Sequence, residues 1–209
     1  MLGLFFSAPA ASPILGAVLY EMTGMWHLDD YLGHCCIVVS VAVVLHHTLR
    51  RLVSDDDLRR MFWRRYAWVP GLAMPGMYVC LRQSDASAHL TNNDILAIPP
   101  DTWLIAYWTV CISAVLYMLA VTGYALRIVR RDPDSRPTAT AWIVAGWCGI
   151  AAGALGLVNA YTGLPLQSAV WLCFCGMTCV FAFSAVHGWR ERLRPFRDLL
   201  MLTRQRATL

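Results

Sequence analysis

Histidine has the widest chemistry in this chain, because imidazole can bind a metal or haem iron and can exchange protons near neutral pH. His46 and His47 are adjacent at the end of one apolar stretch, and His187 ends another. If these stretches are neighbouring helices, the three side chains meet at one end of a bundle, where axial histidines could hold a haem or a metal ion. The simpler expectation is that they are hydrated or bonded to lipid headgroups and that no cofactor binds. Three more histidines could form a second group at the opposite end: His27, His34 and His89.

Two proline–glycine pairs, Pro70-Gly71 and Pro75-Gly76, lie five residues apart in another apolar stretch. Proline removes a backbone donor and glycine loosens a helix, so the helix could break here. Broken helices inside a membrane expose backbone dipoles that transporters use to bind substrates. The four residues are therefore candidates for a ligand-binding site. The alternative is a kinked packing helix, because proline is tolerated in membrane helices.

Four glycines, Gly146, Gly149, Gly153 and Gly156, are spaced by 3, 4 and 3 residues, which places all of them on one helix face. Small residues at this spacing allow two helices in lipid to approach closely. The pattern predicts a helix-packing face. It serves either another helix of the same chain or a partner, which could be a second copy or a different membrane protein.

These elements belong to a chain of 209 residues that is 58% hydrophobic and 14% charged, with a mean hydropathy of +0.50. Soluble domains are about 45–50% apolar and about 25% charged. The composition therefore indicates a multi-pass helical membrane protein, whose first partner is the lipid bilayer. The net charge of +4 comes from arginines in short loops and does not indicate nucleic-acid binding. The sequence contains no phosphate-binding loop, hydrolase elbow or zinc-protease helix, so no catalytic residue is expected.

A helix needs about 20 apolar residues to cross a bilayer. The sequence predicts an all-α bundle of about six transmembrane helices in residues 1–189, followed by a basic cytoplasmic tail at 190–209. The expected spans are 2–20, 31–49, 66–81, 102–126, 139–159 and 166–188. No acidic residue or arginine lies in the middle of a span, which disfavours a cation-coupled carrier built on carboxylates.

Arginine supplies all 17 basic residues, and their positions predict the orientation. All but Arg82 fall in alternate loops or in the tail, whereas the opposite loops are acidic. By the positive-inside rule both termini are cytoplasmic, in a multi-pass protein of the cell membrane. The arginines on the predicted inner side are Arg50, Arg51, Arg59, Arg60, Arg64, Arg65, Arg127, Arg130, Arg131, Arg136, Arg190, Arg192, Arg194, Arg197, Arg204 and Arg206. The opposite loops contain Glu21, Asp29, Asp30, Asp85, Asp94 and Asp101.

Several short patterns resemble one family of membrane proteins. They are His27-Leu28 with Gly33-His34, Pro99-Pro100 with Trp103 and Tyr107-Trp108, the glycine-rich stretch 139–159, and Leu193-Arg194-Pro195-Phe196 after the last span. Together they are similar to actinobacterial multi-pass proteins that are described as transporters. Members of that family have seven helices and an additional cytoplasmic C-terminal domain. The resemblance therefore implies that this chain lacks part of the N-terminal membrane region and that domain. It brings no catalytic residue with it.

Three functions are compatible with these patterns. The first is a transporter-type membrane protein whose substrate binds near Pro70, Gly71, Pro75 and Gly76, against the glycine face of 139–159. The second is a membrane electron-transfer protein that binds haem or a metal through His187 together with His46 or His47. The third is a non-catalytic membrane partner or sensor subunit, docked through the glycine face and the arginine-rich cytoplasmic loops.

Overall fold

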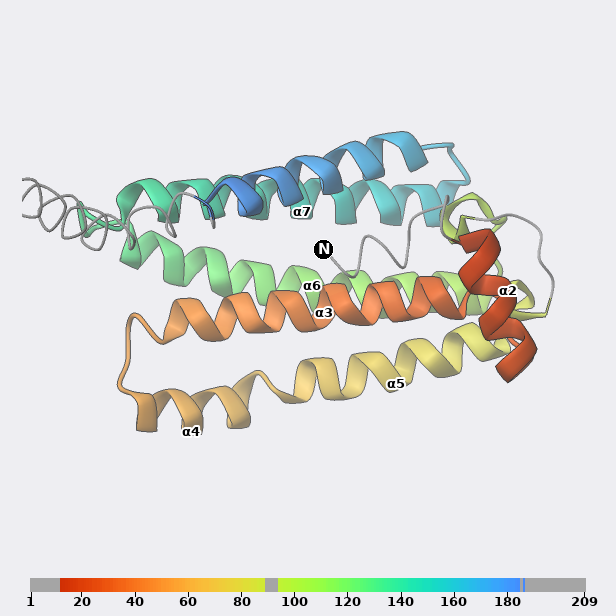
Figure 1. Cartoon of the computed structure of the whole chain (residues 1–209), viewed down its shortest axis with the longest axis horizontal. Helices are drawn as coiled ribbons and strands as arrows, with labels where there is room; N and C mark the ends of the chain where they lie inside the picture. Colours follow the sequence, from red (N-terminus) through yellow and green to blue (C-terminus); the bar gives the residue numbers. More distant parts are fainter. Residues whose placement is uncertain (1–11, 89–93, 185, 187–209) are drawn as a thin grey trace, which may run out of the picture.

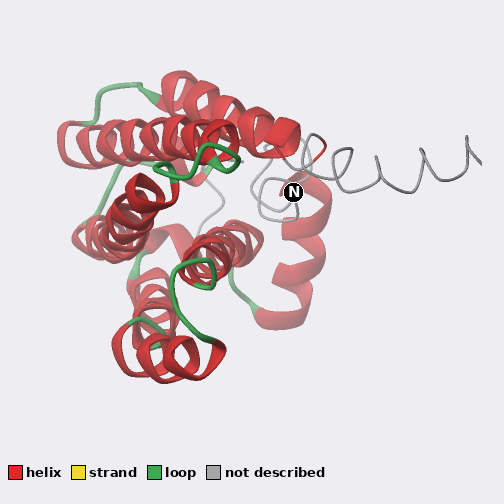
Figure 2. Cartoon of the chain, turned by 90° about the vertical axis from the view of Figure 1, so that its left-hand side faces the viewer, coloured by secondary structure: helices red, strands yellow, loops and turns green. Residues whose placement is uncertain are grey.

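The computed structural model describes residues 12–88, 94–184 and 186, and this part of the chain consists of helices joined by loops, without a β-strand (Figures 1 and 2). The expectation of an all-α fold is confirmed. The α-helices are α2 (Ser12–Thr23), α3 (Leu28–Leu49), α4 (Asp55–Arg65), α5 (Trp68–Gln83), α6 (Thr102–Val129), α7 (Arg136–Thr162) and a further helix, Gln167–Ser184. Two short 3-10 turns, η1 (Asp85–Ser87) and η2 (Ile95–Ala97), lie between α5 and α6.

Four of these helices are long and apolar enough to cross a membrane: α3, α6, α7 and Gln167–Ser184. They correspond to the expected spans 31–49, 102–126, 139–159 and 166–188, the last of which continues past the described residues. Helix α5, which corresponds to the expected span 66–81, has 16 residues and runs beside α3 and α6 (Figure 1). The structure is therefore compatible with a membrane protein.

Helix α2 differs from the other apolar helices in its direction. Residues 2–11 of the expected span 2–20 lie outside the described residues, and α2 lies across the end of the bundle rather than along it (Figures 1 and 2). Two left-handed residues separate it from α3, Gly24 at φ 70° and His27 at φ 60°. Such residues turn the chain sharply. This turn gives α2 its own direction.

Helix α6 is the centre of the bundle, because α3, α5 and α7 all pack against it. Its buried residues include Leu104, Tyr107 and Met118, which are among the largest fully buried side chains described. Since α5 and α7 both pack on α6, each residue of α6 that changes size affects several helices at once.

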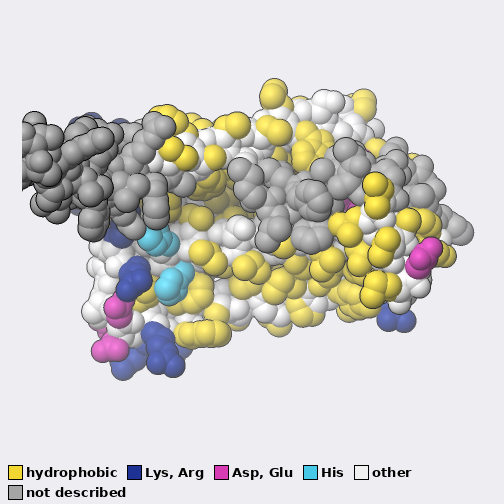
Figure 3. All heavy atoms as spheres, viewed as in Figure 1, with side chains coloured by type: hydrophobic (Ala, Val, Ile, Leu, Met, Phe, Trp, Pro, Cys, Tyr) yellow, Lys and Arg dark blue, Asp and Glu magenta, His cyan; other side chains and the backbone are white. Residues whose placement is uncertain are grey.

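Apart from Arg82 in the last turn of α5, the arginines of the described helices gather at one end of the bundle, where α3 and α6 end and α7 begins (Figure 3). Helix α4 lies at the same end. It has three aspartates in its first turn and Arg64 and Arg65 in its last, which suits the helix dipole. The backbone N–H of Asp57 donates to the Ser54 hydroxyl, an N-cap that fixes the start of α4. The two arginine-rich loops, between α3 and α5 and between α6 and α7, which were predicted to lie on the same side, are therefore also close together in space.

The glycine face of α7 packs mainly inside the chain. A Cβ placed on Gly149 would lie 3.1 Å from Leu119 of α6 and from Met177, and one on Gly153 would lie 3.1 Å from Ile112. A Cβ on Gly156 would lie 3.4 Å from Ile112, whereas a Cβ on Gly146 would have no neighbouring atom within 4 Å. Three of the four predicted packing glycines thus allow α6 to approach α7 closely.

Because Gly149 is packed against α6 and Gly146 is not, a glycine-to-alanine substitution on α7 is expected to change stability differently at the two positions. Gly149→Ala is expected to lower the free energy of unfolding by about 1–3 kcal/mol, because the methyl group overpacks the α6 contact. Gly146→Ala, with open space around it, is expected to leave stability unchanged or raised. Thermal unfolding of both variants in the same detergent measures the difference. Equal melting temperatures would contradict the proposed packing.

Asp101 holds the loop after α5 to the start of α6. One carboxylate oxygen accepts from the Ser84 hydroxyl at 2.6 Å and from the Asp85 N–H at 2.8 Å, and the other caps α6 by accepting from the Leu104 N–H at 2.7 Å. Burial opposes ionisation of Asp101, but these hydrogen bonds outweigh it and hold the pKa of the carboxyl below its usual value. The ionised form of Asp101 therefore stabilises the fold.

The depressed pKa fixes the sign of a pH effect. The stabilisation by ionised Asp101 is fully present above the unfolded-state pKa of about 3.9 and is lost as the pH falls through the lower folded-state value. Asp101→Ala is expected to cost about 1 kcal/mol at neutral pH and less in acid. Unfolding measured between neutral pH and about pH 3 tests this. Asp56→Ala, which removes an exposed carboxyl at the other end, is the control, and an equal pH dependence of the two variants would exclude this role for Asp101.

Candidate functional site

The first two turns of α3 carry a row of polar side chains toward the interior. His27, Asp30 and His34 are spaced by three and four residues, which places them on one helix face. All three are buried, and Asp29 beside them has no exposed surface. Charged groups are rarely fully buried unless they are paired. This end of α3 is therefore the most unusual polar region among the described residues.

His27 and Asp30 form a buried acid–base pair. The Nδ1 of His27 donates to Oδ2 of Asp30 at 3.0 Å, and both side chains are at most 3% exposed. The left-handed backbone at His27 places its ring beside the first turn of α3. Both carboxylate oxygens of Asp29, and Nε2 of His27, have no hydrogen-bond partner among the described residues. The arrangement can hold and exchange a proton.

His34 lies deeper in the bundle and is bound to α6. Its Nδ1 is 2.7 Å from the Tyr107 hydroxyl, and the ring makes an edge contact with Trp108 at a centroid distance of 4.9 Å. Tyr107 is fully buried, so this hydrogen bond fixes the orientation of the imidazole. The remaining nitrogen, Nε2, has no hydrogen-bond partner in the described part of the chain. It is the atom that could bond to a ligand.

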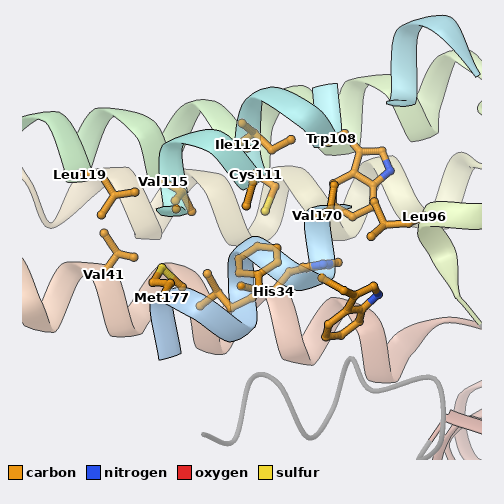
Figure 4. A pocket seen from close by; sticks show the side chains of 17 residues that line it. His34, Val41, Leu96, Trp108, Cys111, Ile112, Val115, Leu119, Val170 and Met177 are labelled. Carbon is orange, nitrogen blue, oxygen red and sulfur yellow. The ribbon is translucent and has the colours of Figure 1, made fainter. Parts of the chain in front are cut away.

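A narrow cleft adjoins His34 (Figure 4), lined by residues of α3, α6, α7, the helix Gln167–Ser184 and Leu96 of η2. Its free volume is about 60 Å³, which is room for a few water-sized groups in a row. His34 is the only ionisable side chain in it apart from the thiol of Cys111. The lining residues are His34, Ile37, Val41, Leu96, Trp108, Cys111, Ile112, Val115, Leu119, Gly149, Ala152, Gly153, Gly156, Val170, Trp171, Phe174 and Met177.

This composition determines what the cleft can bind. Apolar walls favour a slender hydrocarbon chain, and a small number of placed polar groups fixes the orientation of a ligand. His34 offers one such group, and the indole rings of Trp108 and Trp171 offer flat apolar surfaces. The cleft can therefore accept an elongated apolar molecule with one hydrogen-bonding end.

Asn159 joins three segments of the chain beside the cleft. Its side-chain amide donates to the Leu96 carbonyl at 2.9 Å, and its carbonyl oxygen accepts from the Leu166 N–H at 3.2 Å. These bonds join η2, the end of α7 and the start of the last helix. Leu96 and Val170, which lie on either side of this junction, both line the cleft.

The predicted binding residues of α5 lie elsewhere. Helix α5 is continuous from Trp68 to Gln83, with Pro70 in its first turn and Pro75 inside it. None of Pro70, Gly71, Pro75 and Gly76 lines the cleft, and a Cβ on Gly76 would lie 3.7 Å from Val110 of α6. Because α6 lies between α5 and α7, the structure does not bring these residues against the glycine face. Their role in ligand binding stays a prediction.

The predicted haem or metal ligands are only partly described. His46 makes an edge contact with Phe62 at 5.0 Å between ring centroids, and the His47 ring is 5.9 Å from that of Trp142. His187 lies outside the described residues. Within the described ranges, no group of three or more histidines, cysteines or acidic residues is arranged to hold a metal ion. Haem or metal binding by these residues stays a prediction.

The sequence did not indicate that three residues belong to the buried polar region at the start of α3: Asp29, Asp30 and Tyr107. Asp29 and Asp30 were assigned to an outer loop, but α3 begins at Leu28 and buries both in its first turn. The available signal was the helical spacing of His27, Asp30 and His34. Glycines 149, 153 and 156, which were predicted as packing residues, also line the cleft, and Gly146 does not.

Comparisons of the chain with models of protein families, with curated proteins and with solved structures give no match. The site therefore rests on its own geometry.

The two neighbouring aspartates give a matched pair of variants. Asp30→Asn is expected to lower the free energy of unfolding by about 1–3 kcal/mol, because it weakens the charge-assisted bond to His27. Asp29→Asn is expected to raise it, because a buried carboxylate without a partner is costly. Chemical or thermal unfolding in detergent at neutral pH measures both changes. Destabilisation of similar size in both would show that Asp29 has a binding partner.

Proposed function

We propose that this chain is an integral membrane protein of the transporter type, whose substrate is a slender lipophilic molecule with one hydrogen-bonding end. The observation that carries this proposal is the cleft, with apolar walls from four helices and the oriented imidazole of His34. The substrate lies along Ile37, Val41 and Val115, and its polar end bonds to Nε2 of His34. A cleft of about 60 Å³ favours a single chain over a bulky ring system.

Several features support a location in the cell membrane. Four described helices reach spanning length, and large apolar side chains such as Val43, Leu172 and Phe183 are exposed on them. Exposed apolar side chains in this number are expected where lipid is the solvent. The arginine-rich end of the bundle faces the cytoplasm under the positive-inside rule. The resemblance to actinobacterial transporter-type proteins agrees with this proposal.

The two other candidate functions have weaker support. Electron transfer needs a haem or metal, and His46 and His47 are in contact with aromatic rings. A Soret band in the purified protein would favour this alternative. A partner or sensor subunit was expected to dock through the glycine face and the arginine-rich loops, and three of the four glycines on that face are already packed against α6. The cleft therefore favours a carrier.

The first test is to identify what the purified protein carries. An organic extract of protein purified in detergent, analysed by mass spectrometry, is expected to contain one lipophilic compound in an amount comparable to the protein. His34→Leu is expected to lower its retention about fivefold, the factor that corresponds to one hydrogen bond of about 1 kcal/mol. Vesicles containing the protein are then expected to take up the identified compound.

A matched pair of tryptophan substitutions on α3 provides the control. Ile37→Trp fills the cleft, whereas Val39→Trp adds the same side chain at an exposed position that does not line the cleft. Retention and uptake are expected to fall only in Ile37→Trp. Absence of any co-purified lipophilic compound, or equal retention in the two variants, would rule out the cleft as the substrate site.

A further inference from the structure

A second and larger cavity lies nearer the arginine-rich end of the bundle. Its free volume is about 400 Å³, several times that of the cleft. It is formed mainly by the last turns of α6 and the first half of α7, and Leu119 lines both cavities. The residues around it are Val44, Leu119, Ala120, Thr122, Gly123, Tyr124, Leu126, Arg127, Trp142, Ile143, Gly146, Trp147, Ile150 and Phe181. We call it the Arg127 cavity.

The charged end of this cavity is a single arginine. Arg127 lies in the last turn of α6 and is exposed. Its guanidinium makes no hydrogen bond or ion pair with the described residues. Three further arginines follow within nine residues, Arg130, Arg131 and Arg136, and the acidic residues between them are Asp132 and Asp134. This end of the cavity is therefore positive and has an arginine available for an anion.

The rest of the cavity is apolar and aromatic. Gly146 opens onto it, because a Cβ there would meet no atom within 4 Å. Tyr124 lies one turn before Arg127 on α6, Trp142 lies in the first half of α7, and tryptophan and tyrosine are the residues that prefer the headgroup level of a bilayer. Ile150 and Leu119 continue the wall toward the middle of the bundle. A positive end, an aromatic belt and an apolar interior follow one another along the helices.

We propose that the Arg127 cavity binds one anionic phospholipid of the leaflet on the arginine side. The phosphate group bonds to Arg127, and an acyl chain runs past Gly146 toward Ile150 and Leu119. Charge complementarity selects an anionic lipid, because basic pockets between membrane helices attract anionic headgroups. Besides Arg127, the lining offers the Trp142 Nε1, a buried donor that has no hydrogen-bond partner among the described residues. Most of the wall is apolar, however, so an acyl chain is needed to fill the site. The proposal is independent of the substrate assigned to the cleft.

The experiment uses the full chain, stripped of lipid in detergent and titrated with phosphatidylglycerol or phosphatidylcholine while native mass spectrometry counts the bound molecules. One phosphatidylglycerol is expected to bind in preference to phosphatidylcholine. Arg127→Gln is expected to weaken phosphatidylglycerol binding about fivefold, since an arginine near an anionic lipid contributes about 1 kcal/mol. Arg59→Gln, on exposed α4 at the same end, removes the same charge and is expected to have little effect.

A second pair of variants tests the chain-binding part separately. Gly146→Leu places a side chain in the open space of the cavity and is expected to abolish selective binding. Gly71→Leu on α5, whose Cβ position is equally open but lies outside the cavity, is the control. Melting temperatures verify that each variant is folded, and if Arg127→Gln fails to fold, the Gly146→Leu result decides.

Three outcomes would overturn the proposal. Equal binding of the two lipids would remove the role of charge. Equal losses of phosphatidylglycerol binding in Arg127→Gln and Arg59→Gln would show that the lipid is attracted by the whole basic end of the bundle and not by Arg127. Displacement of phosphatidylglycerol by inorganic phosphate at similar concentration would show that the site takes a free anion rather than a lipid. A substrate identified for the cleft, or its absence, changes none of these results.

Discussion

The close approach of α6 and α7 depends on two glycines that leave no room for a side chain. At Gly149 and Gly153 the neighbouring side chains of α6 are so near that a methyl group would displace them. In lipid, where apolar side chains gain little from leaving the solvent, this contact relies on van der Waals packing of small residues. The same α6 residues, Ile112 and Leu119, line the cleft, so the shape of the cleft follows from this helix contact.

The polar groups are arranged around the same central helix. Tyr107 of α6 orients His34 of α3, and Asp101 at the start of α6 fastens the loop that follows α5. One helix thus fixes both the hydrogen-bonding residue of the cleft and the loop that follows α5. The buried carboxylate of Asp29, which has no described partner, is tolerated within this framework. Costly polar groups retained inside an apolar bundle are characteristic of functional rather than packing positions.

The two cavities on the α6–α7 side differ in chemistry. The narrow cleft has the hydrogen-bonding residue His34, whereas the larger cavity has an arginine, Arg127, that makes no ion pair or hydrogen bond with the described residues. Leu119 lines both cavities and is buried. The two cavities therefore share part of their apolar wall. They differ in their polar group, His34 in the cleft and Arg127 in the larger cavity, and this group determines which ligand each one favours.

The sequence by itself determined the class of fold, the helical stretches and the common end of the arginine loops. These depend on composition, on the length of apolar runs and on local capping, as at Ser54 and Asp101, which are properties of nearby residues. It also predicted that Gly146, Gly149, Gly153 and Gly156 share one packing face, of which the last three pack against α6. Only the tertiary structure decided that this face meets α6, that α6 separates the proline–glycine pairs of α5 from α7, and that α3 buries Asp29 and Asp30. The physical reason is that membrane-type helices are apolar on nearly every side, so periodicity does not reveal which side faces inward. Which side of a helix faces inward depends on its packing against segments that are far apart in the chain.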